Sequence, residues 1–366
     1  MGSMDEKFMR RALFLAESRT KDVSPNPRVG AVLVMSGKIV GEGATQPYGG
    51  AHAEIIALRK AGPRAQGATL YVTLEPCSHH GKTPPCSEAI IAAGVRRVVA
   101  AMKDPFPKVR GKGFSLLKRA GIKVGVGLLK KEAGELNPAF FFAVTHGRPW
   151  VLLKVALSMD GKIAGKGGKP LWITGEKARR RVHEMRSRMD AILVGRGTAQ
   201  KDDPALTVRL PGHRRDDGWP LRVLLDSNLR VPPKAQIFQG AAKTVVFTSR
   251  KAPVRREENL RQKGILVFRV PLQEKMLSLK AVLKVLHSLQ VRSLMVEGGG
   301  RVQGTFLKEG LVDEVALLLS PKILGKDALP WRGDGGIENL RRLSFLKQTR
   351  MESVGEDLLL TGKWKG

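Results

Sequence analysis

Three side chains with the donor atoms that zinc prefers stand between residues 52 and 86. His52 is followed two positions later by Glu54, and Cys77 and Cys86 are the only cysteines of the chain. One imidazole and two thiolates suit Zn²⁺ and leave its fourth tetrahedral position for a water molecule. Such a centre has no net charge and can lower the pKa of that water to about 7. Glu54 is not needed as a ligand and is placed to accept the proton, so the pattern predicts hydrolytic chemistry.

The loop between the cysteines leaves an alternative open. It contains His79 and His80, and either imidazole could complete a closed Cys₂His₂ structural site instead. A disulfide is disfavoured, because the N-terminal sequence lacks an export signal and thiols stay reduced in the cytoplasm. We therefore expect a cytoplasmic protein with a catalytic zinc ion bound by His52, Cys77 and Cys86.

The chain is strongly basic. It has 366 residues and a formal net charge of +31. Residues 1–147 contain 22 basic and 11 acidic side chains, and residues 148–366 contain 42 and 22. This charge suits either nucleic acid or a phosphorylated small molecule. Aromatic residues make up only 5% of the chain, too few for platforms that stack single-stranded bases, so we expect no specific nucleic-acid partner. No apolar run approaches the roughly 20 residues of a membrane span, so no membrane partner is expected.

Strands and helices alternate in the first half. Periodicity predicts helices over 5–19, 52–61, 86–93 and 113–120, and strands over 29–35, 38–42, 70–74, 97–102 and 122–126. This alternation is typical of a layered α/β domain. His52 and Cys86 would then stand at the starts of two helices, where the helix dipole favours thiolates.

The long form of the cysteine motif indicates a family. His-x-Glu followed by Pro-Cys and a second Cys is the signature of zinc nucleobase deaminases. Here Pro76–Cys86 reads Pro-Cys-Ser-His-His-Gly-Lys-Thr-Pro-Pro-Cys, which resembles the deaminase half of the bifunctional riboflavin-biosynthesis deaminase/reductase family, usually called RibD. The resemblance implies a cytidine-deaminase-like fold and a substrate contact by Asn26, which by itself reads as a turn residue between two prolines. His79 and Lys82 of the loop are further candidates for substrate binding.

The pattern changes around residues 137–148, and we place a domain boundary between 147 and 148. Beyond it we expect a glycine-rich loop at 165–168, helices over 175–188 and 279–289, and a helix from about Val302. Strands are expected over 150–157, 191–195, 222–225, 244–247, 265–268 and 293–296. The expected fold class is therefore α/β in both halves.

Four motifs of the second half resemble the reductase domain of the same family, which is similar to dihydrofolate reductase. They are Lys-x-x-x-Ser-x-Asp-Gly (154–161), Trp-Ile-Thr (172–174), Asp-Asp-Pro-x-Leu-Thr-x-Arg (202–209) and Glu-Gly-Gly (297–299). Glycines at a strand-to-helix turn let backbone N–H groups approach a phosphate. Such a run is about as often a plain tight turn, and it is not the dinucleotide fingerprint Gly-x-Gly-x-x-Gly.

The resemblance implies an NADPH site and a substrate site in this half. Cofactor contacts are expected from Leu157, Trp172, Thr174, Thr198, Asp202, Gly298, Gly299 and Gly300. Substrate contacts are expected from Lys154, Arg186, Leu206, Arg209 and Glu297. Guanidinium groups suit a sugar phosphate, although Arg186 alone also fits a solvated basic helix face. Arg250, after the strand 244–247, is our candidate partner for the 2′-phosphate of NADPH.

Two consecutive reactions of riboflavin biosynthesis follow from the resemblance. The first is zinc-dependent hydrolytic deamination of 2,5-diamino-6-ribosylamino-4(3H)-pyrimidinone 5′-phosphate. The second is NADPH-dependent reduction of the ribosyl to a ribityl chain, giving 5-amino-6-ribitylamino-uracil 5′-phosphate. We expect a homo-oligomer. Two alternatives remain: a nucleic-acid-acting zinc deaminase with a basic docking domain, and a fusion whose second half has become a regulatory domain. A docking domain would not need the motifs at 202–204 and 297–299.

Overall fold

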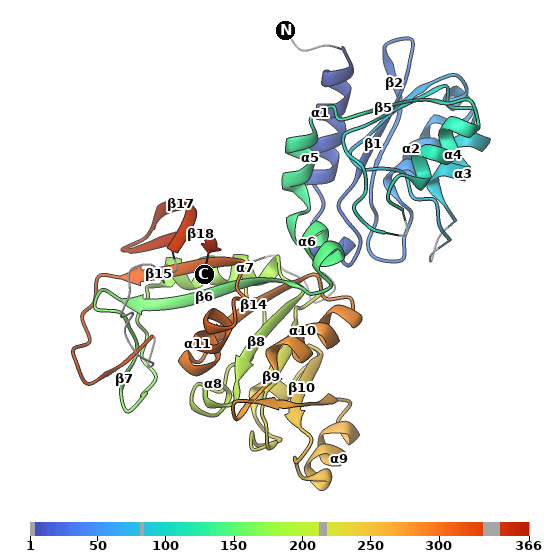
Figure 1. Ribbon diagram of the computed structural model, residues 1–366. Helices are drawn as coiled ribbons and strands as arrows, with labels where there is room; N and C mark the ends of the chain where they lie inside the picture. Colours follow the sequence, from blue (N-terminus) through green and yellow to red (C-terminus); the bar gives the residue numbers. More distant parts are fainter. Residues whose placement is uncertain (1–3, 81–83, 108, 212–217, 332–344, 366) are drawn as a thin grey trace. The chain divides into compact units, whose positions relative to one another are not determined.

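The computed structural model describes residues 4–80, 84–107, 109–211, 218–331 and 345–365 (Figure 1). The chain divides into two compact units, Met1–Gly147 and Arg148–Gly366. Each unit has a β-sheet and hydrophobic clusters of its own. Among the described residues, no helix is both long and apolar enough to cross a membrane.

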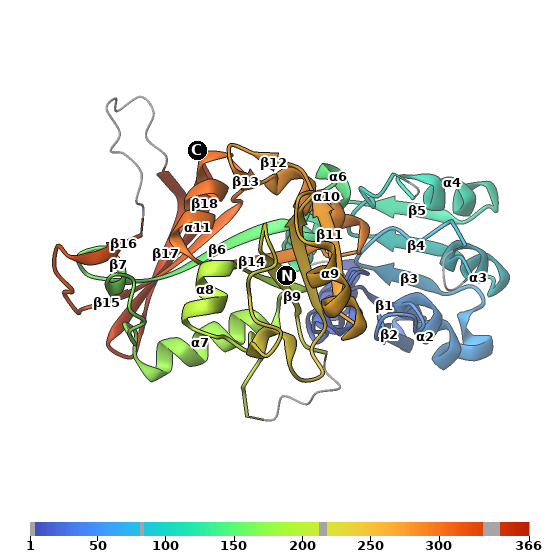
Figure 2. The ribbon, with the colours of Figure 1, turned by 90° about the horizontal axis from the view of Figure 1, so that it is seen from below.

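The first unit is built on a five-stranded sheet (Figure 2). β1 pairs antiparallel with β2 and β3, whereas β3, β4 and β5 run parallel. In spatial order the strands are β2 (Lys38–Ala44), β1 (Gly30–Met35), β3 (Thr69–Val72), β4 (Arg97–Ala100) and β5 (Lys123–Val126). The helices are α1 (Met4–Glu17), α2 (Ala53–Ala61), α3 (Cys86–Ala92), α4 (Lys112–Arg119), α5 (Lys130–Leu136) and α6 (Pro138–His146).

Both faces of this sheet are buried, because successive residues of a strand point to opposite sides. On one side Ala31 and Leu33 of β1 pack in a cluster with residues of α2, α3 and α4. On the other side Val32 and Val34 pack with residues of α1. α2 lies directly on β2, since a Cβ at Gly41 would lie 2.2 Å from the carbonyl oxygen of Ala57. The result is an α/β/α layered unit.

The second unit has a nine-stranded mixed sheet. In spatial order its strands are β11 (Leu266–Val270), β10 (Thr244–Ser249), β9 (Leu221–Leu225), β8 (Ala191–Gly195), β14 (Ser293–Gly298), β6 (Trp150–Ser158), β15 (Glu314–Ser320), β18 (Asp357–Lys365) and β17 (Phe345–Val354). The seven from β11 to β15 run parallel, and β18 and β17 add an antiparallel edge. Two short pairs are β12 (Leu272–Gln273) with β13 (Met276–Leu277), and β7 (Lys162–Lys166) with β16 (Ala328–Pro330).

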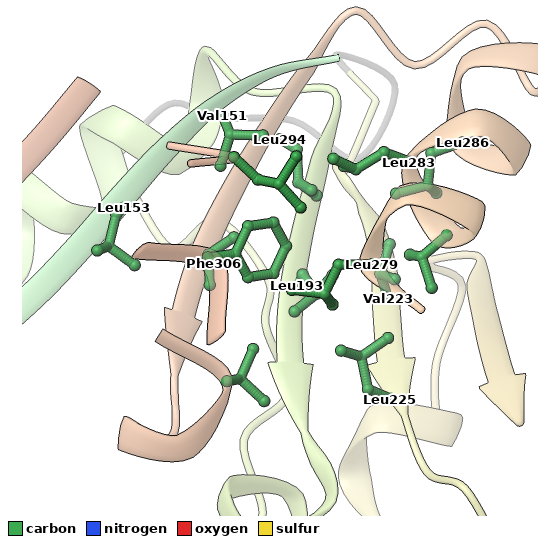
Figure 3. Packing of buried hydrophobic residues seen from close by; sticks show 14 of the residues in the cluster. Val151, Leu153, Leu193, Val223, Leu225, Leu279, Leu283, Leu286, Leu294 and Phe306 are labelled. Atoms are coloured by element: carbon green, nitrogen blue, oxygen red, sulfur yellow. The ribbon is translucent and has the colours of Figure 1, made fainter. Parts of the chain in front are cut away.

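Helices cover both faces of the larger sheet. They are α7 (Glu176–Ser187), α8 (Arg196–Lys201), α9 (Val254–Gln262), α10 (Leu279–Ser288) and α11 (Gly300–Lys308). Figure 3 shows one face, where Phe306 of α11 and Leu283 of α10 pack with strand residues such as Leu193. On the opposite face the neighbouring Ile192 packs in a cluster with Ala178 of α7. This burial on both faces explains the near-continuous apolar runs of the parallel strands.

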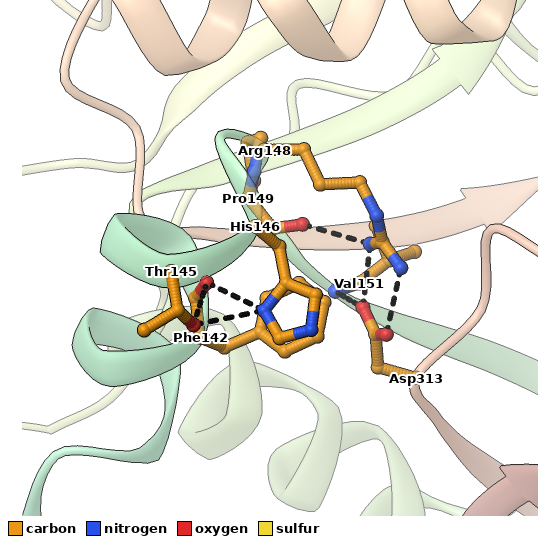
Figure 4. A network of polar contacts seen from close by, with 7 residues as sticks. All are labelled: Phe142, Thr145, His146, Arg148, Pro149, Val151 and Asp313. Atoms are coloured by element: carbon orange, nitrogen blue, oxygen red, sulfur yellow. Dashed lines mark hydrogen bonds and ion pairs between the residues drawn. The ribbon is translucent and has the colours of Figure 1, made fainter. Parts of the chain in front are cut away.

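Polar contacts fix the ends of the elements around the boundary (Figure 4). In the second unit, the Arg148 guanidinium binds both carboxylate oxygens of Asp313 at 2.8 and 2.9 Å, and the backbone N–H of Val151 donates to the same carboxylate. In the first unit, the His146 ring stacks on Phe142 with centroids 4.0 Å apart at the end of α6.

The α/β class predicted for both halves is confirmed, and the expected strands and helices lie within a few residues of their predicted positions. The glycine-rich loop expected at 165–168 begins two residues later, at Gly167, because Lys162–Lys166 is a strand that pairs with distant β16. Only Gly167 and Gly168 take the left-handed turn conformation, with φ of 66° and 75°.

Candidate functional site

His52, Cys77 and Cys86 come together in the first unit, although the sequence separates them. Their ligand atoms all lie within 4.8 Å of one another. The Nδ1 atom of His52 is 3.2 Å from the sulfur of Cys86 and 3.5 Å from that of Cys77. His52 is the N-cap of α2 and Cys86 is the first residue of α3. Two helix starts and the loop after β3 thus position the group.

Helix starts also supply hydrogen-bond donors to this cluster. The backbone N–H of Cys86 donates to the sulfur of Cys77 over 3.3 Å. Hydrogen bonds from the Cys86 thiol and from His52 lower the pKa of Cys77 to about 4, against the effect of burial. The arrangement therefore favours a thiolate at Cys77.

Glu54 lies in the first turn of α2 and is 4% exposed. Burial raises the pKa of Glu54 to about 7, although the neighbouring His52 opposes the shift. A carboxyl group with a pKa near neutrality can both accept and donate a proton under physiological conditions.

The loop histidines lie outside the three-residue cluster. Among the described residues, His79 and His80 are not part of the metal-binding group. The His79 ring contacts Phe106 edge to face, and its buried Nδ1 has no hydrogen-bond partner in the described part of the chain. His80 lies 3.7 Å from Glu88. Lys82 falls outside the described residues.

Asn26 lies in the turn before β1. Its backbone N–H donates to the carbonyl of Val23, as expected for a turn residue. The same segment holds the chain that leads to His52, because the N–H of Tyr48 donates to the carbonyl of Asp22. The turn that contains Asn26 therefore follows a segment that is hydrogen-bonded to the segment before His52.

In the second unit, three predicted residues from three elements form a buried ionic cluster. The carboxylate of Glu297, at the end of β14, accepts bonds of 2.6 and 2.8 Å from Arg186 of α7. The Lys154 ammonium of β6 lies 3.3 Å from the same carboxylate. The three side chains are only 7–12% exposed. Burial alone would raise the pKa of Glu297, but Arg186 and then Lys154 outweigh it and lower the pKa to about 2.

The glycine turn after β14 is closely packed against α8. A Cβ at Gly298 or Gly299 would lie 3.2 or 3.1 Å from the hydroxyl oxygen of Thr198. Gly299 is the N-cap of α11, and Gly300 is the first residue of that helix. Because the N-cap is a glycine, it supplies no side-chain hydrogen bond to the first turn of the helix.

The other predicted contacts of this half differ in their exposure. Leu157, Thr174 and Leu206 are buried, whereas Trp172 is 76% exposed, with the Arg179 guanidinium 4.8 Å from the centre of its ring. Asp202 and Arg209 are exposed, and Arg250 is exposed directly after β10. The structure brings Lys154, Arg186 and Glu297 together, and Thr198 with Gly298 and Gly299. Asp202 joins the second of these groups, because its backbone N–H donates to the carbonyl of Thr198 over 2.9 Å.

Comparison with known proteins assigns both units. Residues 149–360 match the family model "RibD C-terminal domain", and residues 2–102 match "Cytidine and deoxycytidylate deaminase zinc-binding region". The riboflavin biosynthesis protein RibD of Aquifex aeolicus is 43% identical over 98% of each chain. That of Escherichia coli is 41% identical over 97% of this chain and 98% of its own length. The chain belongs to the RibD family.

Solved structures agree with this assignment. Acinetobacter baumannii RibD superposes with a TM-score of 0.91 at 36% identity, covering 99% of both chains. A deaminase/reductase from Thermotoga maritima gives a TM-score of 0.80 at 37% identity over 98% of both chains. The suggested cytidine-deaminase-like and reductase-type domains are thereby confirmed.

The first unit fits the zinc ion of the RibD family. Tetrahedral zinc with Zn–S near 2.3 Å and Zn–N near 2.1 Å places its ligand atoms roughly 3.6–3.8 Å apart. The two distances from His52 to the sulfurs, 3.2 and 3.5 Å, lie close to these values. Small outward shifts of the side chains would make room for the ion.

The second unit fits the NADPH of RibD reductase domains. The start of α11, whose glycine N-cap makes no side-chain cap, offers backbone N–H groups to a diphosphate. Glu297, which binds the cations Lys154 and Arg186, lies near the carboxyl end of β14, and parallel α/β sheets bind their ligands at such ends.

Sequence reasoning missed three residues that position these sites. Glu75, buried before Pro76, accepts bonds from the backbone N–H groups of Asp104, Gly111 and Phe114. His183 of α7 accepts the N–H of Arg209 over 3.2 Å. Arg222 of β9 is 1% exposed. The one available signal was an arginine inside an otherwise apolar strand, which implies buried acceptors.

Proposed function

We propose that the chain deaminates a phosphorylated diaminopyrimidine in residues 1–147 and reduces its ribosyl group with NADPH in residues 148–366. The product would be 5-amino-6-ribitylamino-uracil 5′-phosphate. The observation that carries this proposal is the coexistence of two separate polar centres in one chain of the RibD family. One joins His52, Cys77 and Cys86 beside a buried carboxyl group. The other is the buried cluster around Glu297.

For the deamination, we assign the zinc ligands to His52, Cys77 and Cys86. The bound ion supplies Lewis acidity that activates water for attack on the amine-bearing ring carbon. Glu54 takes the proton of the attacking water and passes it to the ring nitrogen and then to the departing ammonia. Asn26, His79 and Lys82 orient the pyrimidine. His79 supports this role because its buried Nδ1 is unpaired within the described part of the chain.

For the reduction, NADPH supplies the hydride, and the chain supplies placement and charge. Gly298, Gly299 and Gly300 with Thr198 would hold the diphosphate at the start of α11. The remaining cofactor contacts are assigned to Leu157, Trp172, Thr174 and Asp202. Substrate contacts are assigned to Leu206, Arg209 and Glu297.

Lys154 is the proposed proton donor to the sugar oxygen, held in place by Glu297. For Arg186, a predicted substrate contact, the hydrogen bonds support a positioning role. Its Nε and Nη2 atoms are bonded to Glu297 and its Nη1 donates to the carbonyl of Thr207. It therefore orients Glu297 and the segment leading to Arg209, whereas exposed Arg209 is the better candidate for binding phosphate.

The net charge of +31 is, in this proposal, matched to phosphate-bearing small molecules and not to a specific nucleic acid. A homo-oligomer and a cytoplasmic location complete the proposal. Two free cysteines in a metal-binding geometry suit a reducing compartment.

A coupled assay tests the proposed function. The zinc-loaded chain is mixed with the diaminopyrimidine riboside phosphate and NADPH, and the nicotinamide absorbance is followed. We expect NADPH to be consumed with release of one ammonia per hydride transferred. Another outcome is that ammonia is released while NADPH is not oxidised, even when the deaminated substrate is supplied directly. In that case the second half is a regulatory domain. If only oligonucleotides are deaminated, the nucleic-acid alternative holds.

A further inference from the structure

A basic groove of about 430 Å³ lies on the first unit, beside the cysteine loop. Ser78, directly after Cys77, forms part of its wall, and α4 with the residues before it forms the rest. Four cationic side chains line the groove, and no acidic side chain does. They are Lys103, Arg110, Lys112 and Arg119.

No carboxylate of the described residues pairs with these four cations. Elsewhere in the first unit, by contrast, Arg11 is paired with Glu42 and Arg97 with Asp5. Four like charges around one small space repel one another, and a bound anion would relieve that repulsion.

The groove also offers a hydrogen-bond donor. The Ser78 hydroxyl oxygen is buried and has no partner among the described residues. A buried hydroxyl without a partner costs free energy, which a ligand oxygen accepting its proton would recover. The polar wall therefore suits an anion with several acceptor oxygens.

The wall of the groove is held in a fixed position. Glu75 accepts the backbone N–H groups of Gly111 and Phe114 and so anchors the start of α4. Gly111 has a φ of 88°, and a Cβ there would lie 2.8 Å from the Lys103 ammonium. Glycine at this position thus leaves the space that the lysine occupies. The same carboxylate ties the groove to the segment that carries Cys77.

We propose that this groove binds the 5′-phosphate of the pyrimidine substrate during deamination. The proposal rests on the proposed function of the first unit. A phosphomonoester dianion offers three terminal oxygens to guanidinium forks, ammonium groups and a hydroxyl. Because Ser78 adjoins Cys77, a phosphate bound here would hold the substrate next to the metal-binding cluster.

The test compares two groove variants, Arg110→Gln and Arg119→Gln, with Lys118→Gln. Lys118 is an exposed cation of α4, the helix that contains Arg119, and it does not line the groove. Zinc-loaded full-length variants are assayed for ammonia release from the riboside phosphate and from the dephosphorylated riboside. We expect each groove variant to raise KM for the phosphorylated substrate about tenfold or more, with kcat unchanged. The dephosphorylated substrate should be unaffected, and Lys118→Gln should behave like the unaltered chain.

The outcomes separate this inference from the proposed function. If both groove variants match Lys118→Gln in KM and in inhibition by inorganic phosphate, the groove is not the phosphate site. If the unaltered chain releases no ammonia, the proposed deamination fails. Calorimetry then still tests the groove. The unaltered chain should bind the phosphorylated pyrimidine more tightly than the dephosphorylated one, and the groove variants should lose this difference. The groove variants could instead lose an oligonucleotide binding that the unaltered chain shows at about 150 mM salt, while their KM stays unchanged. That result would assign the groove to nucleic acid and overturn the proposal.

Discussion

Two buried glutamates show how the same side chain is adapted to two chemistries. Burial raises the pKa of Glu54 to about 7, because the charge of His52 opposes this effect only in part. The side chain of Glu297 is only 7% exposed, but Arg186 and Lys154 lower its pKa to about 2. The first group can exchange a proton near neutrality, whereas the second remains a permanent charge that orients its neighbours.

Replacing Glu54 by Gln tests the proton-shuttle role. The amide keeps the shape of the side chain but cannot accept a proton, so deamination should fall by at least about 10²-fold. Zinc content, measured by atomic absorption, should stay the same. Reduction of the deaminated substrate should also be unchanged, because that centre lies in the other unit. Full deamination by a zinc-loaded Glu54→Gln chain would remove Glu54 from the mechanism.

The Glu297→Gln change should destabilise the second unit in a pH-dependent manner. At pH 7 it leaves Arg186 and Lys154 buried without a counter-charge, at a cost of about 3–5 kcal/mol. The folded-state pKa of Glu297, about 2, lies below its ordinary value of 4.5. The stabilisation is therefore complete above pH 4.5 and is lost as the pH falls towards 2.

Denaturant unfolding at several pH values measures this effect. The difference between the unaltered chain and Glu297→Gln should narrow below pH 4.5. Glu356→Gln, at an exposed carboxylate of the same unit, is the matched control and should change little. A constant difference from pH 7 to pH 3.5 would show that the ion pairs do not stabilise the fold.

At the scale of elements, the sequence predicted those parts whose signal is local. The helix beginning after His52 and the strand over 191–195 were visible from periodicity and apolar runs. β7 was not, because its strand character depends on β16, more than a hundred residues away. The short helix α8 was also missed, since five of its six residues are polar or glycine and only Ala199 is buried. Pairing and packing over long separations decide such elements.

The same limit applies to the candidate site: its residues could be predicted from local motifs, but their contacts could not. Motif chemistry found Glu297, Lys154 and Arg186, but it assigned Arg186 to the substrate and not to an ion pair with Glu297, because α7 and β14 meet only in the folded unit. Nor could it find Arg222. This guanidinium donates to the carbonyls of Ala205, Gln236, Gln239 and Ala242, a partner set that exists only after folding.

Arg222 is expected to hold in place the segment that contains Leu206, a predicted substrate contact. Ala205, one of its partners, directly precedes Leu206, and burial lowers the pKa of Arg222 to about 10. Arg222→Lys keeps the charge but loses the planar fork, leaving buried carbonyls unpaired at about 1–3 kcal/mol. We expect lower stability and a raised KM for the reductase substrate with a smaller change in kcat. Lys243→Gln, at an exposed site beside β10, is the control, and an unchanged KM in Arg222→Lys would refute the link.

For the whole molecule, the important feature is that each unit has its own sheet and its own core. Hydrophobic clusters of the first unit are formed by residues from Phe8 to Phe141, and those of the second by residues from Trp150 to Trp364. The length and the change of pattern near residue 147 suggested two domains from the sequence. Composition alone did not reveal where the positive charge is left unpaired, because ion pairing depends on the fold.

Metal removal should therefore affect the two units differently. Zinc bound to the folded first unit but not to the unfolded chain stabilises that unit by RT ln(1 + [Zn]/Kd), about 4 kcal/mol at a thousandfold excess over Kd. For a unit of this size, a chelator should lower the corresponding melting temperature by roughly 10 °C. Calorimetry should show this shift in one transition while the other, and reduction of the deaminated substrate, stay unchanged. Cys77→Ser lacks a ligand and should melt at the lower temperature with or without the chelator. A chelator effect that persists in Cys77→Ser, or that falls on the reductase transition, would place the metal elsewhere in the chain.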